Sequence, residues 1–251
     1  MSVKITATGN AGFHVAAPGT SVLIDALWEG VPRFLGGQRP APTENLPANL
    51  ILVTHAHWDH FSPSRVAEAA ARTGAAVVGA ADVIRRLRGG VPDGLLVTLE
   101  PPETPRGGPA ASATVETAGA TVTALRTSHG QRHNSYLVRM GAFSFFHDGD
   151  NEDTRPLDVE FLRPVDALLL CPWQGSRWPD FVERLAPQRW FLTHLTDEEF
   201  DEHFAGRFLP GLSDRVPLAD RVVALRPGES FEFDQCWKTR QGSPPPGMST
   251  Q

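Results

Sequence analysis

Three histidines and one aspartate lie within six positions of the segment THAHWDHF, directly after the apolar run NLILV. His55 and His57 are two residues apart, so in an extended or turning segment both project to one side and can reach one ion. Asp59 and His60 follow at the predicted start of a helix, where the turn can aim them at a second position nearby. Imidazole nitrogens and a carboxylate are ligands favoured by zinc and related divalent metals. The spacing therefore predicts a metal site.

Three further candidates end predicted strands elsewhere in the chain. His129 ends the alternating run TVTALRTS, Asp150 follows FSFF and a glycine, and His194 ends RWFLT. Asp148 stands two residues before Asp150 and can point the same way, so the choice between these two carboxylates stays open, with Asp150 favoured. Several strands that deliver side chains to one edge of an α/β scaffold provide what such a site requires.

The elements that must position these residues are short strands alternating with short helices. Ser62 and Pro63 form a helix start, and Gly74 is typical of a helix end. Two hairpins are predicted with the turns AGA and RMGA, and an acidic helix is expected over Asp197–Phe208. The other predicted strands are VKITATG, TSVLIDAL, NLILVTH, AAVVGA, VDALLLCPW, QRWFLTH and two in RVVALRPGESFEF, and the other predicted helices are ADVIRRLRGG and WPDFVERLAP. This alternation favours an α/β layered sandwich.

The composition limits the classes of function. The chain has 251 residues, 41% of them apolar, and a formal net charge of -6, which argues against a surface that binds nucleic acid. With no apolar window as long as a membrane span and no signal segment, we expect a soluble cytoplasmic protein. We expect a single domain over residues 1–238 and a disordered tail over residues 239–251, and we interpret Cys171 and Cys236 as thiols.

The segment THAHWDH matches the T-H-x-H-x-D-H signature of the metallo-β-lactamase superfamily. The resemblance continues in VKITATGNAGFHVAAPGTSVLIDAL, which looks like the two opening strands of that family, and in TSHG, FFHDGDN and WFLTHL, which fall where the family has its other ligands. The chain most resembles the branch of metal-dependent hydrolases that includes L-ascorbate-6-phosphate lactonase and the phospholipase D that acts on N-acyl phosphatidylethanolamines. The resemblance implies a four-layer αββα sandwich.

It also implies two divalent metal ions, zinc by preference, with manganese or iron tolerated by the same nitrogen and oxygen donors. The implied ligands are His55, His57 and His129 for the first ion, Asp59, His60 and His194 for the second, and Asp150 between the two. Asp25 would support the histidine loop without touching metal. The implied activity is hydrolysis of a small ester, lactone or phosphodiester by a metal-bridging hydroxide, with Asp59 as the catalytic carboxylate that orients the hydroxide or accepts its proton.

Other functions on this scaffold stay open at this stage. They are an iron-dependent oxidoreductase similar to sulfur dioxygenases, a catalytically silent metal-binding relative, and an RNA-processing enzyme, against which the acidic charge argues. The sequence departs from the family at Asn10 and Asn151, which bears on the surroundings of the ligands and on substrate choice. A small-molecule substrate is expected, and the oligomeric state is not indicated.

Several residues near the motif have two interpretations. Residues 28–48 can cover the cleft, with Arg33, Phe34 and Arg39 on the substrate, or form an idle loop. His133, with Asn134, and Trp58 can face the substrate, although Trp58 can equally well pack. Trp173 can wall the cleft or cap the core, with the core favoured. Cys171 is expected to be a buried small residue, and the spacings of His14, His147 and His203 suggest no role.

Overall fold

The computed structural model describes residues 2–30, 39–105, 107–130, 132–173 and 177–234. Their strands form two seven-stranded sheets. From edge to edge the first sheet contains β14 (Ser230–Phe233), β1 (Val3–Gly9), β2 (Gly12–Ala17), β3 (Thr20–Ile24), β4 (Leu50–Leu52), β5 (Ala76–Gly79) and β6 (Leu96–Thr98). The second contains β13 (Val222–Val223), β12 (Arg189–Leu192), β11 (Ala167–Leu170), β10 (Phe143–His147), β9 (Asn134–Met140), β8 (Ala120–Arg126) and β7 (Ser112–Thr117).

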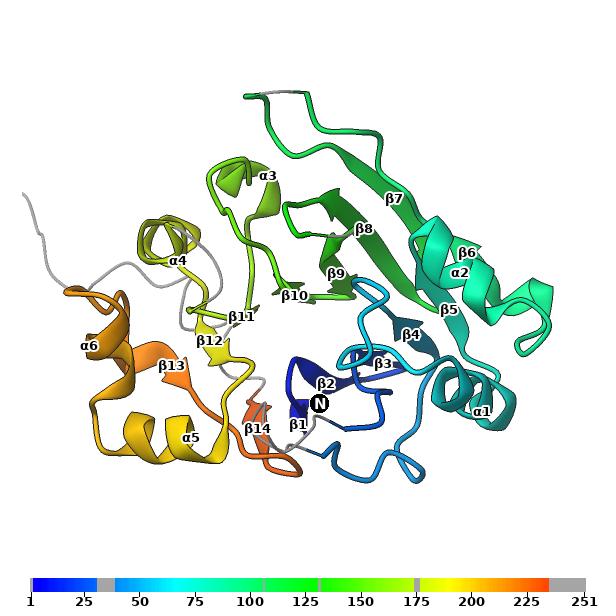
Figure 1. The fold of residues 1–251 in the computed structure, drawn as a ribbon, viewed down its shortest axis with the longest axis horizontal. Helices are drawn as coiled ribbons and strands as arrows, with labels where there is room; N and C mark the ends of the chain where they lie inside the picture. The colour runs from blue at the N-terminus through cyan, green and yellow to red at the C-terminus, as the bar shows by residue number, and fades with distance from the viewer. Residues whose placement is uncertain (1, 31–38, 106, 131, 174–176, 235–251) are drawn as a thin grey trace, which may run out of the picture.

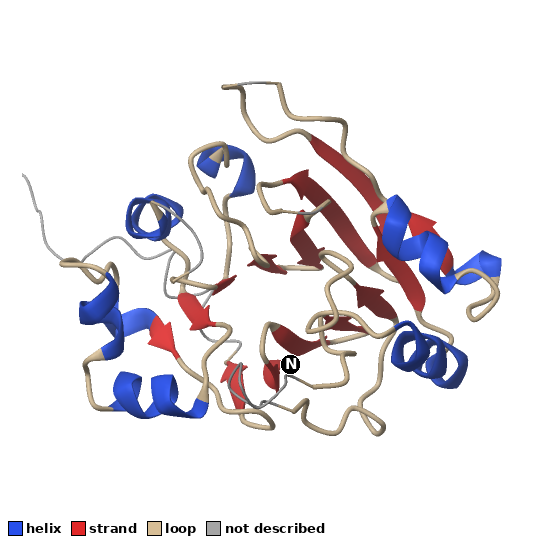
Figure 2. Ribbon diagram, viewed as in Figure 1, coloured by secondary structure: helices blue, strands red, loops and turns tan. Residues whose placement is uncertain are grey.

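Helices flank both sheets, so the predicted αββα sandwich is confirmed (Figure 1). The first sheet is accompanied by α1 (Pro63–Thr73) and α2 (Ala81–Leu87), and the second by α3 (Val159–Leu162), α4 (Trp178–Leu185), α5 (Asp197–Phe204) and α6 (Phe208–Leu212). Figure 2 shows the helices at the periphery and the strands between them. Two 3-10 turns occupy Asp93–Leu95 and Ala219–Arg221.

Alternation along the central strands produces three apolar layers. In β4, Leu50 and Leu52 pack into the layer between the sheets, whereas Ile51 faces α1 and α2. In β11, Leu169 joins the inner layer and Leu168 faces the helices on the other side. Because successive side chains of a strand point to opposite faces, a strand buried on both faces is apolar throughout, as these two are.

The helix ends follow the local sequence signals. The Ser62 hydroxyl accepts the Arg65 N–H, and Gly74, at φ 69°, ends α1 with its N–H on the Ala70 carbonyl, as predicted. Two expectations are wrong. The acidic helix ends at Phe204 instead of Phe208, since Gly206 has a left-handed φ of 74° and breaks it before α6 begins.

The opening segment is the second correction, because it forms three strands instead of two. A turn at Asn10, with φ 52°, separates β1 from β2, and the Pro18–Gly19 turn separates β2 from β3. The four-residue helix α3 was not expected from the sequence. Arg33, Phe34, Cys236 and the tail 239–251 lie outside the described residues. None of the helices that the structure describes has the length and apolar character of a membrane span.

Candidate metal centre

The predicted site residues follow the carboxyl ends of strands from both sheets. The segment 53–62 follows β4, and Asp25 follows β3. In the second sheet, His129 follows β8, Asp150 follows β10 and His194 follows β12. The strand residues that face the layer between the two sheets are apolar and pack together there. The polar site residues therefore lie in the segments that follow the strands.

The structure brings seven of these residues into two groups whose candidate donor atoms lie within 4.8 Å of one another. We call His55, His57, His129 and Asp150 the first cluster, and Asp59, His60 and His194 the second cluster. In the first cluster, the Nδ1 atom of His57 lies 2.7 Å from His55 Nε2 and 3.2 Å from His129 Nε2. In the second, the Nε2 atoms of His60 and His194 are 3.1 Å apart.

Asp150 contacts both clusters with different oxygens. Its Oδ1 lies 3.0 Å from His60 Nε2 and 2.9 Å from His194 Nε2. Its Oδ2 lies 3.7 Å from His55 Nε2 and 3.8 Å from His129 Nε2. Asp148, the alternative left open by the sequence, instead bonds with Ser135 and Asn151 and belongs to neither cluster.

Four of the five histidines are held by a hydrogen bond at the nitrogen that faces away from the clusters. His55 Nδ1 lies 2.9 Å from the Thr54 hydroxyl, His129 Nδ1 lies 3.1 Å from Glu152, and His194 Nδ1 lies 3.1 Å from the Thr193 hydroxyl. His60 Nδ1 lies 2.8 Å from Asp25 Oδ2. Such outer partners fix the ring and its tautomer, which leaves the other nitrogen as a donor.

The donor set fits a divalent cation. Although Asp150 Oδ1 is close to two imidazoles, it is buried and makes no hydrogen bond to any residue that the structure describes. A buried carboxylate carries a desolvation cost that positive charge beside it must offset, and a cation held among these atoms would supply that charge. Nitrogen and oxygen donors in this mixture suit zinc, and also manganese or iron.

Charge is distributed unevenly among these groups. Burial lowers the pKa of His60, but the carboxylates of Asp150 and Asp25 outweigh it and hold that pKa well above its usual range. Burial raises the pKa of Asp150, but His60 and His194 outweigh it and hold that pKa well below its usual range. Burial, together with the neighbouring His60, depresses the pKa of His55. The centre therefore favours a positive charge beside Asp150.

Asp25 and Asn10 hold the second cluster from behind. Asp25 is buried, and its oxygens accept the Thr54 N–H at 2.8 Å and the Thr54 hydroxyl at 2.6 Å as well as contacting His60. Asn10 donates from Nδ2 to both the carbonyl and the carboxylate of Asp59. Asn10, Asp25 and His194 have left-handed backbones, with φ of 52°, 45° and 61°. Backbone strain of this kind clusters at functional sites.

Sequence reasoning missed three residues that hold the site. Glu152, two positions after Asp150, had no spacing that marked it as a partner of His129. His147 was set aside, yet it is buried and bonds with the Ala11 carbonyl and the Gly149 N–H. His133, which the sequence allowed to face the substrate, is fully buried and accepts the Asp150 N–H. For His133 and His147, the signal in the sequence was only their position, directly before β9 and at the end of β10.

The other candidates divide between surface and core. Trp58 and Trp173 are each 47% exposed, so neither is a core residue. Trp173 lies edge-on to the His194 ring with centroids 6.0 Å apart, and its Nε1–H donates to the His194 carbonyl. Trp173 therefore walls the centre and does not cap the core. Cys171 is buried, as expected, and His14 bonds with the Pro47 carbonyl away from both clusters.

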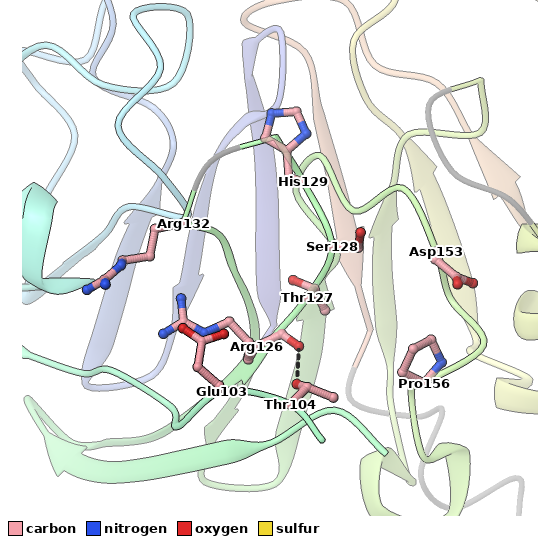
Figure 3. A pocket seen from close by; sticks show the side chains of 9 residues that line it. All are labelled: Glu103, Thr104, Arg126, Thr127, Ser128, His129, Arg132, Asp153 and Pro156. Carbon is pink, nitrogen blue, oxygen red and sulfur yellow. Dashed lines mark hydrogen bonds between the residues drawn. The ribbon is translucent and has the colours of Figure 1, made fainter. Parts of the chain in front are cut away.

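A cavity of about 400 Å³ shares His129 with the first cluster (Figure 3). Most of the residues that line it have polar side chains: Glu103, Thr104, Arg126, Thr127, Ser128, His129, Arg132, Asp153 and Pro156. Arg126 and Arg132 both contact Glu100, whose pKa is lowered because these cations and the Ala81 N–H outweigh its burial. The Arg132 side chain is 47% exposed.

Comparison with known proteins agrees with this geometry. Residues 20–194 match the family model described as the beta-lactamase superfamily domain. A UPF0173 metal-dependent hydrolase of Nitratidesulfovibrio vulgaris is 32% identical over 94% of this chain and 97% of its own length. The corresponding protein of Methanopyrus kandleri is 27% identical over 92% of this chain and 100% of its own length.

Solved structures share the fold at low identity. Igni18, a metallo hydrolase from Ignicoccus hospitalis, superposes with a TM-score of 0.64 at 18% identity, covering 93% of this chain and 99% of that one. CmlA, a diiron beta-hydroxylase from Streptomyces venezuelae, superposes with a TM-score of 0.60 at 16% identity, covering 92% of this chain and 54% of that one. The family model and the 32% identity to the Nitratidesulfovibrio vulgaris protein show that the chain belongs to the UPF0173 metal-dependent hydrolases of the beta-lactamase superfamily.

Proposed function

We propose that this hydrolase uses two metal ions and acts on a small ester, lactone or phosphodiester. The proposed ligands are His55, His57 and His129 for the first ion and Asp59, His60 and His194 for the second, with Asp150 shared. The observation that supports this most is the division of the two Asp150 oxygens between the clusters. A carboxylate in that position suits a bridge between two ions.

The ions, zinc by preference, would lower the pKa of a bound water toward neutrality, polarise the substrate oxygen and stabilise the leaving group. The chain's own contribution is to fix the donors and to handle the proton. The Asp59 side chain is 23% exposed, and the Asn10 amide donates to its Oδ2 at 3.2 Å. It is therefore oriented and still accessible, so that it can orient the attacking water or accept its proton.

The cavity beside His129 favours a polar substrate over a long acyl chain. Three hydroxyl-bearing residues, two arginines and two acids line it together with His129 and Pro156, so a substrate there would meet several hydrogen-bonding and charged groups. A molecule there would reach His129 and so the first cluster. Lactones or phosphodiesters of polar molecules, including the sugar-phosphate lactones suggested by the resemblance to L-ascorbate-6-phosphate lactonase, fit these walls better than lipids do.

Metal analysis coupled to a screen of lactones, phosphodiesters and thioesters tests this function. We expect about two ions per chain in the wild type. His57→Ala and Asp59→Ala should lose stoichiometric metal uptake and turnover, while His14→Ala, away from both clusters, should keep them. A doubly substituted protein with full activity would refute the mechanism.

An iron-dependent oxidoreductase is the second candidate, because CmlA carries diiron chemistry on this fold and the donors present also accept iron. Purification without oxygen followed by elemental analysis separates the two functions. Iron at full occupancy together with oxygen consumption on a persulfide would favour the oxidoreductase. Zinc together with hydrolysis of a substrate from the screen would exclude it.

A further inference from the structure

The Gly149–Asp150 segment lies between two buried histidines that belong to neither cluster. The Gly149 N–H donates to His147 Nδ1 at 2.9 Å, and the Asp150 N–H donates to His133 Nε2 at 3.0 Å. His147 can then carry its proton on Nε2, which lies 2.8 Å from the Ala11 carbonyl. Two successive peptide N–H groups thus each donate a hydrogen bond to an imidazole nitrogen.

The hydrogen bonds around His133 have one consistent direction. Because Nε2 accepts, the proton of the neutral ring is on Nδ1 and is donated to the Thr127 hydroxyl at 2.7 Å. The Ser135 hydroxyl donates to the Asp148 carbonyl at 2.8 Å, so in the 3.0 Å contact between the two hydroxyls Thr127 is the donor. The Ser135 N–H also donates to the Thr127 oxygen. These hydrogen bonds connect His133, through Thr127 and Ser135, to the backbone carbonyl of Asp148, two residues before Asp150.

The ring of His133 also fits closely against Gly149. A Cβ at that position would lie 2.5 Å from His133 Nε2 and 3.0 Å from its Cε1. Gly149 has a left-handed φ of 62°, which lets the chain turn after β10 and direct the Asp150 side chain into the centre. Any residue with a Cβ at position 149 would therefore collide with the His133 ring.

Packing alone does not account for a histidine here. His133 has no exposed surface, and a buried imidazole carries a desolvation cost that an apolar side chain of similar size avoids. The imidazole supplies what an apolar side chain cannot, an acceptor for the Asp150 N–H joined to a donor for Thr127. An apolar replacement would leave a buried backbone N–H without a partner.

We propose that His133 is a positioning residue for metal binding: through the Asp150 N–H it fixes the peptide from which Asp150 reaches both clusters. The proposal rests on the proposed function, because it concerns the carboxylate shared by the two ions. His133 itself does not bind metal in this arrangement, since both of its nitrogens are committed to protein groups.

Zinc affinity, measured by competition with a chelating dye in the metal-free protein, tests the proposal. His133→Ala should weaken zinc binding about 10- to 100-fold, as loss of an outer hydrogen-bond partner does. His133→Gln, which can place an amide oxygen near the Asp150 N–H, should recover most of the affinity. His14→Ala, another buried histidine with a backbone bond, is the matched control and should leave the affinity unchanged. Circular dichroism and thermal melts of each metal-free variant check that it folds.

Nuclear magnetic resonance of the histidine ring nitrogens gives a second measurement on the wild type. His133 should keep its proton on Nδ1 and show a free, hydrogen-bond-accepting Nε2 both before and after zinc is added. A zinc-dependent shift typical of a ligated Nε2, or wild-type zinc affinity in a folded His133→Ala protein, would overturn the proposal. A wild type that binds no zinc, manganese or iron would overturn the proposed function first, so the two failures are distinguishable.

Discussion

The two clusters differ in how their histidines are held. In the second cluster, the partners behind the rings are Asp25 and Thr193, both buried. In the first, His55 is also held by a buried partner, Thr54, but His129 is held by Glu152, whose side chain is 49% exposed, and His57 is only half-buried. The cavity touches the first cluster through His129.

This difference indicates that the two proposed metal positions have different roles. Buried partners are ordered by the surrounding core and lose little on binding an ion, so the second cluster is the more preorganised one. The first cluster keeps access to solvent and to the cavity, which a position that meets substrate requires. That contrast can be tested by changes that affect the two clusters unequally, after metal has first been removed from both.

Chelation of both ions should have the largest effect. Each cluster combines residues from loops of both sheets, so bound ions join the two halves of the sandwich. An ion present at a thousandfold excess over its Kd stabilises the folded chain by about 4 kcal/mol. We expect the melting temperature to fall by several degrees when metal is removed and to recover on addition of zinc. Equal melting curves with and without metal would contradict a link between the sheets.

Asp150→Ala should come next, because it removes the one residue that both clusters share. Zinc affinity should fall by more than the roughly 100-fold that loss of an outer partner costs at most. Equilibrium dialysis measures the number of ions retained. Asp148→Ala is the paired control on the same segment, since Asp148 faces Ser135 and Asn151. If Asp148→Ala lost the ions and Asp150→Ala kept them, the assignment of the shared carboxylate would be wrong.

Asp25→Asn should weaken the second cluster about 10- to 100-fold and the first cluster much less, because Asp25 contacts His60 directly but reaches His55 only through the Thr54 hydroxyl. Burial raises the pKa of Asp25, but His60 outweighs it and the pKa is lowered, so the native carboxylate is charged. The amide removes this charge behind His60 while keeping nearly the same shape. Titration with cobalt, whose absorption bands report ligand geometry, should show one ion bound nearly as in the wild type and one bound weakly. Weakening of both ions to the same extent would remove the contrast between the clusters.

Glu152→Gln should have the smallest effect. The carboxylate is half exposed, so solvent already competes for its contact with His129, and the amide oxygen can still accept the Nδ1–H. We expect a change of about threefold or less in the affinity of the first ion, consistent with a modest net hydrogen bond. An effect larger than that of Asp25→Asn would reverse the proposed order of the two clusters.

The fold was largely predictable because its signals are local. The apolar runs of β4, β5, β11 and β12, the cap at Ser62 and the glycine at 74 each determine an element within a few residues. The αββα layering, by contrast, came from the family resemblance. The division of the opening segment into three strands was missed because only two residues, Asn10 and Ala11, separate β1 from β2, although asparagine readily adopts the left-handed turn conformation found there.

The site was predictable as a set of residues but not as a geometry. His55, His57, Asp59 and His60 form a compact motif, whereas the separation of Asp148 from Asp150 depends on the left-handed turn at Gly149, where strand alternation no longer applies. The role of His133 depends on a contact across 17 residues, and no pattern within either segment indicates it. This contact forms only when β9 pairs with β10, which brings the residue before one strand beside the residues after the other.

The left-handed backbone at His194 sets a limit on how stable the metal-free chain can be. A non-glycine residue there costs of the order of 1 kcal/mol or more, whereas its imidazole, 2.9 Å from Asp150, stabilises that carboxylate. Glycine at this position would relieve the backbone strain, but it would remove that contact and one of the three residues of the second cluster. Selection for robustness and selection for catalysis thus act in opposite directions on this one residue.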